Sequence, residues 1–279
     1  MTDTRRITLA HSPDSDDAFM FWALAEGHVV VDGIEFEHTL ADIQTLNQAA
    51  LKGRYDITAI SVHAYPYVSH EYALMNVGAS VGDGYGPSIV ARGNLAMDDL
   101  PGLTVAIPGS LTTAALVLRL AIPEISTVEM AFDRIIEAVK RGEAPAGLII
   151  HEGQITYREE GLERIVDLGE WWRHETGLPL PLGANVIRRD LGEEVIAKVV
   201  DAVRSSIAYG LEHRAKAMGY AKEYGRDLRQ EQVDRFVSMY VNDFTLDWGE
   251  SGRKAVHELL RRGSEAGIVP SVDRIDFVG

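Results

Sequence analysis

The feature that most constrains the fold is a regular alternation of short apolar runs with longer amphipathic segments in the first half of the chain. The apolar runs predict strands at residues 7–11, 34–39, 57–60, 103–107 and 148–151. The segments between them predict helices at residues 16–27, 42–53, 111–121 and 133–142. Such alternation indicates βαβ units and a largely parallel sheet, and so an α/β fold. Residues 193–267 are helical in pattern throughout, which is typical of a tail that packs around a sheet.

Two segments of similar type suggest that the chain crosses twice between two lobes. Residues 86–92 and 183–189 each begin with small residues, continue with a branched apolar pair and end with a basic residue. We expect a larger, discontinuous lobe of residues 1–90 plus 186–279 and a smaller lobe of residues 91–185, with a ligand cleft between them. The alternative is one continuous sheet in which both segments are ordinary strands.

Composition narrows the classes of partner. The 279 residues carry a net charge of −15, which argues against nucleic acid and membrane surfaces, since both select basic faces. The absence of cysteine excludes disulfides and cysteine nucleophiles. Residues 1–6 lead directly into a strand with no signal-peptide core, so we expect a cytoplasmic protein that binds a small molecule. A homodimer is one option that the sequence leaves open.

His151 is the first candidate for chemistry. The apolar run at residues 146–150 is typical of a buried strand, and His151 and Glu152 follow it directly. In open α/β sheets, ligands bind beyond the carboxyl ends of such strands, and histidine exchanges protons near neutral pH. The alternative is a histidine that only caps a backbone carbonyl. Strand alternation would place Glu152 on the opposite face, as a solvated or loop-capping residue.

Two further loops follow predicted strands and should face the same cleft. In the loop at residues 12–17, Ser12, Asp14 and Asp17 are candidate ligand contacts. Capping of the next helix explains Asp16, and Asp17 is either a second capping residue or a ligand contact. The surplus carboxylates could bind the hydroxyl groups of a sugar-like ligand. Ser61 is either a ligand contact or the N-cap of the following helix.

The turn from residue 108 to residue 113 is the best anion site that the sequence offers. Gly109 and Ser110 lead into a helix with Thr112 and Thr113 in its first turn, and such a turn exposes backbone N–H groups and hydroxyls to a carboxylate or phosphate. The alternative is an ordinary capped helix. A P-loop, a dinucleotide fingerprint and metal-ligand spacing are all absent from the sequence, so we predict no metal site.

Taken together, these motifs resemble those of a known family, the 1,4-dihydroxy-6-naphthoate synthases of the futalosine route to menaquinone. The resemblance covers nearly the whole chain. The motifs that carry it lie at residues 12–19 (SPDSDDAF), 46–53 (LNQAALKG), 61, 86–87 (GP), 108–113 (PGSLTT), 147–152 (GLIIHE), 156–157 (TY), 176–183 (TGLPLPLG) and 240–244 (YVNDF).

The resemblance implies a two-lobed fold like that of the type 2 periplasmic solute-binding proteins. It implies a cytoplasmic enzyme that needs no cofactor and converts cyclic dehypoxanthinyl futalosine, a carboxylate, to 1,4-dihydroxy-6-naphthoate. His151 matches the family's general base, and Ser61, Thr112 and Thr113 match hydroxyl residues that line its cleft. The family usually reads SPCPNDTF at the first loop, so the carboxylates of Asp14 and Asp16 replace neutral residues here.

Two other functions are compatible with this fold. A solute-binding protein would need only a polar cleft, but the His151 motif and the absent signal peptide argue against it. The related chorismate dehydratase shares the fold, and the GLIIHE motif favours the synthase over it. Replacement of His151 distinguishes an enzyme from a binder, since only an enzyme should lose its activity.

Overall fold

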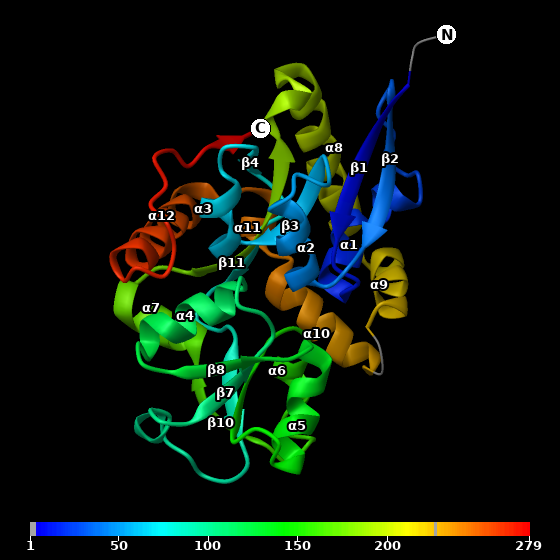
Figure 1. Ribbon diagram of the computed structural model, residues 1–279. Coiled ribbons are helices and arrows are strands. Elements are labelled where there is room, and N and C mark those ends of the chain that lie inside the picture. Colours follow the sequence, from blue (N-terminus) through cyan, green and yellow to red (C-terminus); the bar gives the residue numbers. More distant parts are fainter. Residues whose placement is uncertain (1–3, 226–227) are drawn as a thin grey trace.

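The computed structural model describes residues 4–225 and 228–279 and contains two β-sheets (Figure 1). Residues 1–3 of the N-terminal segment and residues 226–227 of the predicted helical tail lie outside the described part. The strands of the larger sheet, in spatial order, are β12 (Phe277–Val278), β4 (Tyr72–Met75), β11 (Leu180–Arg188), β3 (Ile57–Ser61), β1 (Arg5–His11) and β2 (Ile34–Leu40), with β5 (Ser80–Gly82) also paired to β11.

The smaller sheet is built from the middle of the chain. Its strands, in spatial order, are β10 (Glu163–Asp167), β6 (Ser88–Ala91), β9 (Ala146–Ile149), β7 (Thr104–Ile107) and β8 (Ser126–Glu129). In Figure 1 this sheet lies below the larger one, and α10 lies between the two.

Helices cover both sheets. Beside the larger sheet lie α1 (Ser15–Ala25), α2 (Ile43–Ala50), α3 (Tyr65–Val68), α8 (Glu193–Glu212), α9 (Arg214–Glu223), α10 (Gln230–Tyr240), α11 (Asp243–Leu246) and α12 (Gly249–Glu265). Beside the smaller sheet lie α4 (Thr113–Ala121), α5 (Ile135–Arg141), α6 (Gly153–Thr156) and α7 (Leu168–Thr176). Short 3₁₀ turns occupy Val62–Ala64, Met97–Asp99, Phe132–Arg134 and Arg189–Leu191.

Sheet direction corrects one expectation. The pairs β1–β2, β1–β3, β7–β8 and β7–β9 are parallel, as the alternating pattern predicts. However, β11 runs antiparallel to β3, β4 and β5, and β6 runs antiparallel to β9 and β10. Both sheets are therefore mixed rather than largely parallel. The antiparallel strands β6 and β11 are those predicted to cross between lobes, and each runs against the direction of its βαβ neighbours.

The two sheets are built from the parts of the chain expected in the two lobes, but they do not fix the lobe boundaries. All strands between residues 5 and 82 and between residues 180 and 278 belong to the larger sheet, and those between residues 88 and 167 belong to the smaller one. The single continuous sheet is thus excluded. The lobe boundaries at residues 90 and 186 stay a prediction. Strand β6 begins before residue 90 but belongs to the smaller sheet, and β11 begins before residue 186 but belongs to the larger sheet.

Helix α1 is the best buried helix that borders the site. It is apolar on most of its circumference, and Phe19, Phe21 and Trp22 are all buried between the larger sheet and helices α8, α9 and α10. A helix that is apolar all round must be buried, and each large side chain contributes about 1.5–3 kcal/mol on burial. The loop that precedes α1 is therefore held on a rigid base.

No helix in the described ranges is both long and apolar enough to cross a membrane.

Candidate active site

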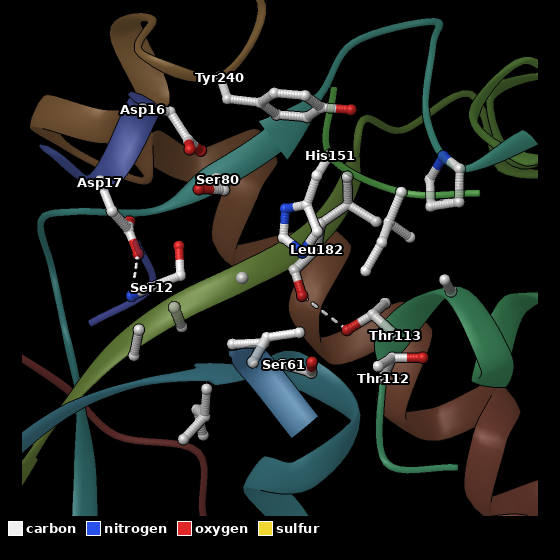
Figure 2. A pocket seen from close by; sticks show the side chains of 18 of the residues that line it. Ser12, Asp16, Asp17, Ser61, Ser80, Thr112, Thr113, His151, Leu182 and Tyr240 are labelled. Atoms are coloured by element: carbon white, nitrogen blue, oxygen red, sulfur yellow. Dashed lines mark hydrogen bonds between the residues drawn. The ribbon is translucent and has the colours of Figure 1, made fainter. Parts of the chain in front are cut away.

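A central cavity of about 730 Å³, its open mouth included, lies between the two sheets (Figure 2). Its walls come from loops at the carboxyl ends of strands and from helices of both halves. The polar residues that line it are Ser12, Asp16, Asp17, Ser61, Ser80, Thr112, Thr113, His151, Gln154, Asn185 and Tyr240. The four loops singled out from the sequence therefore do meet at one place.

His151 stands on a backbone turn rather than at the strand end. Strand β9 ends at Ile149, two residues earlier than expected, and His151 has a φ of +54°. It is the only non-glycine residue with positive φ in the described part of the chain. L-residues avoid this left-handed conformation, which costs about 1–2 kcal/mol. The turn carries the imidazole into the cavity, where its exposed fraction is 16 %.

The imidazole of His151 is held on one side and open on the other. Nδ1 lies 3.0 Å from Oδ2 of Asp14, a residue that is only 2 % exposed. The ring of Phe132 packs edge-on against the imidazole, with 4.9 Å between ring centroids. Nε2 is buried and has no hydrogen-bond partner among the described residues. Asp14 itself does not line the cavity but lies behind His151.

The acidic loop does not cap α1 in the expected way. Asp14 occupies the N-cap position, yet its side chain makes no capping hydrogen bond. Asp17 instead turns back on the loop, and its Oδ2 accepts a hydrogen bond of 2.7 Å from the backbone N–H of Ser12. The carboxylates of this loop therefore serve the loop and the cavity rather than the helix end.

Burial changes the charge of this loop. Desolvation raises the pKa of Asp17 to about 6, against the lowering effect of hydrogen bonds from Ser12. Desolvation also raises the pKa of Asp16 well above its usual value, and the neighbouring charges of Asp17, Asp14 and Glu152 add to this effect. Asp16 is therefore biased towards its neutral form.

Glu152 differs from expectation. It is buried, not solvated, and it is near enough to Asp16 to raise the pKa of that group. The expectation assumed that strand geometry continues to residue 152, whereas Glu152 already has helical φ and ψ.

Ser61 is held in place by Asn47. The side-chain oxygen of Asn47 accepts from the backbone N–H of Ser61 at 2.8 Å, and its amide donates to Ser61 Oγ at 3.0 Å and to the Leu111 carbonyl at 3.3 Å. Because Ser61 Oγ accepts from Asn47, its own proton is left for a ligand. Ser61 makes no capping hydrogen bond to the turn that follows it.

The start of α4 forms the opposite wall. Thr112 is its N-cap: its Oγ1 accepts from Ala115 N at 3.2 Å and donates to the Gly109 carbonyl at 2.8 Å. Thr113 Oγ1 donates to the Leu182 carbonyl at 2.6 Å. Both hydroxyls are thus occupied within the protein. The helix itself supplies no acceptor for the first backbone N–H groups, those of Thr113 and Ala114, which are the donors that an anion could use.

Gly109 and Ser110 do not line the cavity. The Gln44 side chain lies over this turn, and its Oε1 accepts from Leu111 N at 3.3 Å. Contact of Gly109 and Ser110 with a ligand therefore stays a prediction.

Two residues at or beside the site were not candidates in the sequence analysis, although Tyr240 begins the motif at residues 240–244. Tyr240, in the last turn of α10, bonds the side-chain amide of Gln154 at 2.8 Å across the cavity. His63 is buried, does not line the cavity, and its Nδ1–H donates to the Thr112 carbonyl at 2.9 Å. Both lie within helical segments, where periodicity reports burial but not function.

Charge in the cavity is distributed unevenly. Within the described ranges, no lysine or arginine lines it. Asp16 and Asp17 lie at one end and Thr112 and Thr113 at the other, with His151 between them (Figure 2). A ligand with an anionic end and a hydroxyl-bearing end would match this polarity.

The architecture is that of the periplasmic-binding-protein fold. A solved gene product of Candida albicans described with that generic fold matches with a TM-score of 0.73 at 14 % identity, over 99 % of this chain and 98 % of the other. The alkanesulfonate-binding protein of Xanthomonas axonopodis pv. citri matches with a TM-score of 0.71 at 12 % identity, over 97 % and 96 % of the two chains. At such identities the likeness concerns the fold alone.

Sequence comparison places the chain within one family of this fold. The family model described as menaquinone biosynthesis matches residues 7–265, and the chain belongs to that family. A 1,4-dihydroxy-6-naphthoate synthase of Thermus thermophilus is 43 % identical over 98 % of this chain and 99 % of its own length. One of Streptomyces coelicolor is 38 % identical over 95 % of each. A crystal structure of an Archaeoglobus fulgidus protein matches with a TM-score of 0.91 at 47 % identity, over 95 % and 98 % of the two chains.

Proposed function

We propose that this chain is a 1,4-dihydroxy-6-naphthoate synthase, a cofactor-independent lyase that converts cyclic dehypoxanthinyl futalosine in menaquinone biosynthesis with His151 as general base. Membership of the family supports the proposal, as do two relatives of that name that align over nearly the whole chain. A cytoplasmic location and a homodimer stay predictions of the sequence.

The observation that carries the mechanism is the state of His151. Its Nδ1 is engaged by Asp14, while its buried Nε2 has no partner on the cavity wall. A buried ring nitrogen without a partner is costly, and such a group marks a place where a ligand completes the bonding. A base must reach the proton that it takes, and Nε2 is the atom placed to do so.

The polarity of the cavity supports one orientation of the substrate. The aryl carboxylate would bind the backbone N–H groups of Thr113 and Ala114 and the hydroxyl of Ser61. The sugar-derived end would then lie beside Asp16 and Asp17, whose raised pKa values reduce the negative charge that it meets. Thr112 and Thr113 would shape the anion site mainly by holding the turn, because their hydroxyls are already bonded.

In this orientation His151 faces the reacting part of the substrate. Nε2 takes a proton next to the carbonyl, and the electron pair moves to the carbonyl oxygen to give an enolate. The enolate re-forms its carbonyl as a carbon–carbon double bond forms and the neighbouring carbon–carbon bond breaks. The leaving carbon of the sugar-derived remainder takes the proton back from Nε2. General-base catalysis typically contributes about 10²–10⁴-fold to a rate. Enclosure between the two sheets would exclude water from this step.

The test is conversion of the substrate by purified protein. Wild type, His151→Gln and His174→Gln are each incubated with cyclic dehypoxanthinyl futalosine, and 1,4-dihydroxy-6-naphthoate is followed by chromatography. His174 is an exposed histidine outside the cavity and serves as the matched control. We expect product from wild type and His174→Gln, and at least about a 10²-fold slower rate from His151→Gln.

Calorimetric binding of the same substrate separates the alternatives. Tight binding without turnover by wild type would favour a solute-binding protein. Turnover of chorismate instead would favour the related dehydratase. Equal activity of His151→Gln and wild type would refute the role of His151 while leaving the reaction in place.

A further inference from the structure

We propose that Asp14 is a positioning residue for His151, and that the two form a carboxylate–imidazole dyad in the wall of the central cavity. The proposal rests on the proposed function, since it assigns the base a partner. It concerns a side chain that the sequence suggested only as a substrate contact.

Geometry gives the first argument. Asp14 Oδ2 lies 3.0 Å from His151 Nδ1, within the range of a charge-assisted hydrogen bond. The carboxylate is 2 % exposed and does not line the cavity, so it is shielded from bulk water and from direct contact with a ligand there. A carboxylate in that place acts on the imidazole rather than on the substrate.

The bond sets the form of the ring. A carboxylate accepts hydrogen bonds only, so Nδ1 must carry the proton. Nε2 then carries the lone pair, and Nε2 is the nitrogen left without a partner. The edge of Phe132 limits rotation of the ring from the side. Asp14 therefore selects the tautomer in which the free nitrogen is a base.

The carboxylate also acts during the reaction. When Nε2 accepts the substrate's proton, the imidazole becomes a cation whose Nδ1–H still points at Asp14. The proton on Nδ1 stays where it is, and the negative charge nearby stabilises the cation in a site shielded from water. Orientation and charge stabilisation by a buried carboxylate are the roles that a histidine's partner has in other enzymes.

The two partners come from elements beside different sheets. Asp14 precedes α1 beside the larger sheet, and His151 follows β9 of the smaller one. Tyr240 and Gln154 bond across the same cavity nearby. The contact between Asp14 and His151 therefore joins elements that belong to the two different sheets.

The dyad is tested by two variants with different effects. Asp14→Asn keeps the shape and removes the charge, and Asp14→Ala removes the acceptor. Both variants should fold, because the charge of Asp14 raises the pKa of its buried neighbour Asp16 and its removal relieves that repulsion. Asp56→Asn is the control: Asp56 is a half-buried carboxylate that bonds Thr8 and does not line the cavity.

Turnover and the ring itself give separate readouts. With cyclic dehypoxanthinyl futalosine, Asp14→Asn should lower kcat by about 10- to 10²-fold while KM changes by less than about twofold, since Asp14 acts on the base and not on substrate binding. ¹⁵N chemical shifts of the imidazole at alkaline pH should show Nδ1 protonated in wild type, and loss of this preference in Asp14→Ala.

Each outcome decides something. Three results would each overturn the dyad. The first is an unchanged His151 tautomer in Asp14→Ala, and the second is a kcat of Asp14→Asn within twofold of wild type. The third is a loss of kcat in Asp56→Asn as large as that in Asp14→Asn. If wild type fails to turn over, the proposed function fails, and the ¹⁵N measurement still tests the contact between Asp14 and His151.

Discussion

The buried charge of Asp17 should make the protein less stable at neutral pH than an amide in the same place would. Asp17 is 7 % exposed, and burial raises its pKa from 3.8 to about 6. A folded-state pKa above the unfolded one means that stability is present below pH 3.8 and is lost as pH rises towards 6. Two units of pKa correspond to about 3 kcal/mol.

We therefore expect Asp17→Asn to be more stable than wild type above pH 6. An asparagine oxygen can still accept from the Ser12 N–H, so the bond of 2.7 Å is kept in weaker form. Loss of a negative charge in the first turn of α1 costs about 0.3–1 kcal/mol, which is smaller than the desolvation that it relieves. The net gain at pH 7 should be about 2 kcal/mol, falling towards zero at pH 4.

Urea unfolding of both proteins at several pH values measures this difference. Glu258→Gln is a control of opposite sign, because hydrogen bonds from Arg261 and Arg262 lower the pKa of Glu258 to about 2. That variant should be less stable than wild type at pH 7, with the loss shrinking as pH falls from 4.5 to 2. A stability difference for Asp17→Asn that does not change with pH would refute the reasoning.

Two other substitutions test the packing of the site. Asn47→Ala should lower the free energy of unfolding by about 1–3 kcal/mol, because three hydrogen bonds of a buried amide are lost. It should also raise KM, because Asn47 no longer holds Ser61 in place. An unchanged KM would contradict that role. Gly147→Ala should cost about 1–3 kcal/mol in thermal or urea unfolding, since its Cβ would lie 2.4 Å from Ile135 Cγ2. Gly219→Ala, a helical glycine with open space around it, should instead stabilise by about 0.5–1 kcal/mol, and the same sign for both glycines would count against this account of the packing.

Much of the fold could be predicted because its signals are local. Helix α2 begins after Asp42, whose side chain accepts from Thr45 N, and α5 ends at Gly142 in the left-handed conformation. Such caps depend on only a few residues that are neighbours in the sequence. Strand pairing is not local, and nothing in the sequence of β6 or β11 says that each runs against its neighbours.

The site shows the same division. The loops that hold Ser12, Ser61, Thr112 and His151 could be found because they follow apolar runs, and all four residues line the cavity. The partnership of Asp14 with His151 could not be found, since it depends on how two distant loops meet. The left-handed conformation of His151 could not be predicted either, because an apolar strand pattern does not show at which residue the strand ends.

The central claim is that His151 stands between an anion-binding end and a hydroxyl-binding end of one cavity. A crystal structure of His151→Gln with intact cyclic dehypoxanthinyl futalosine tests it most directly. The account predicts the aryl carboxylate at the first N–H groups of α4, the sugar-derived end beside Asp16, and the reacting carbon within about 3.5 Å of the side chain at position 151. A substrate bound in the reverse direction, or far from position 151, would contradict it.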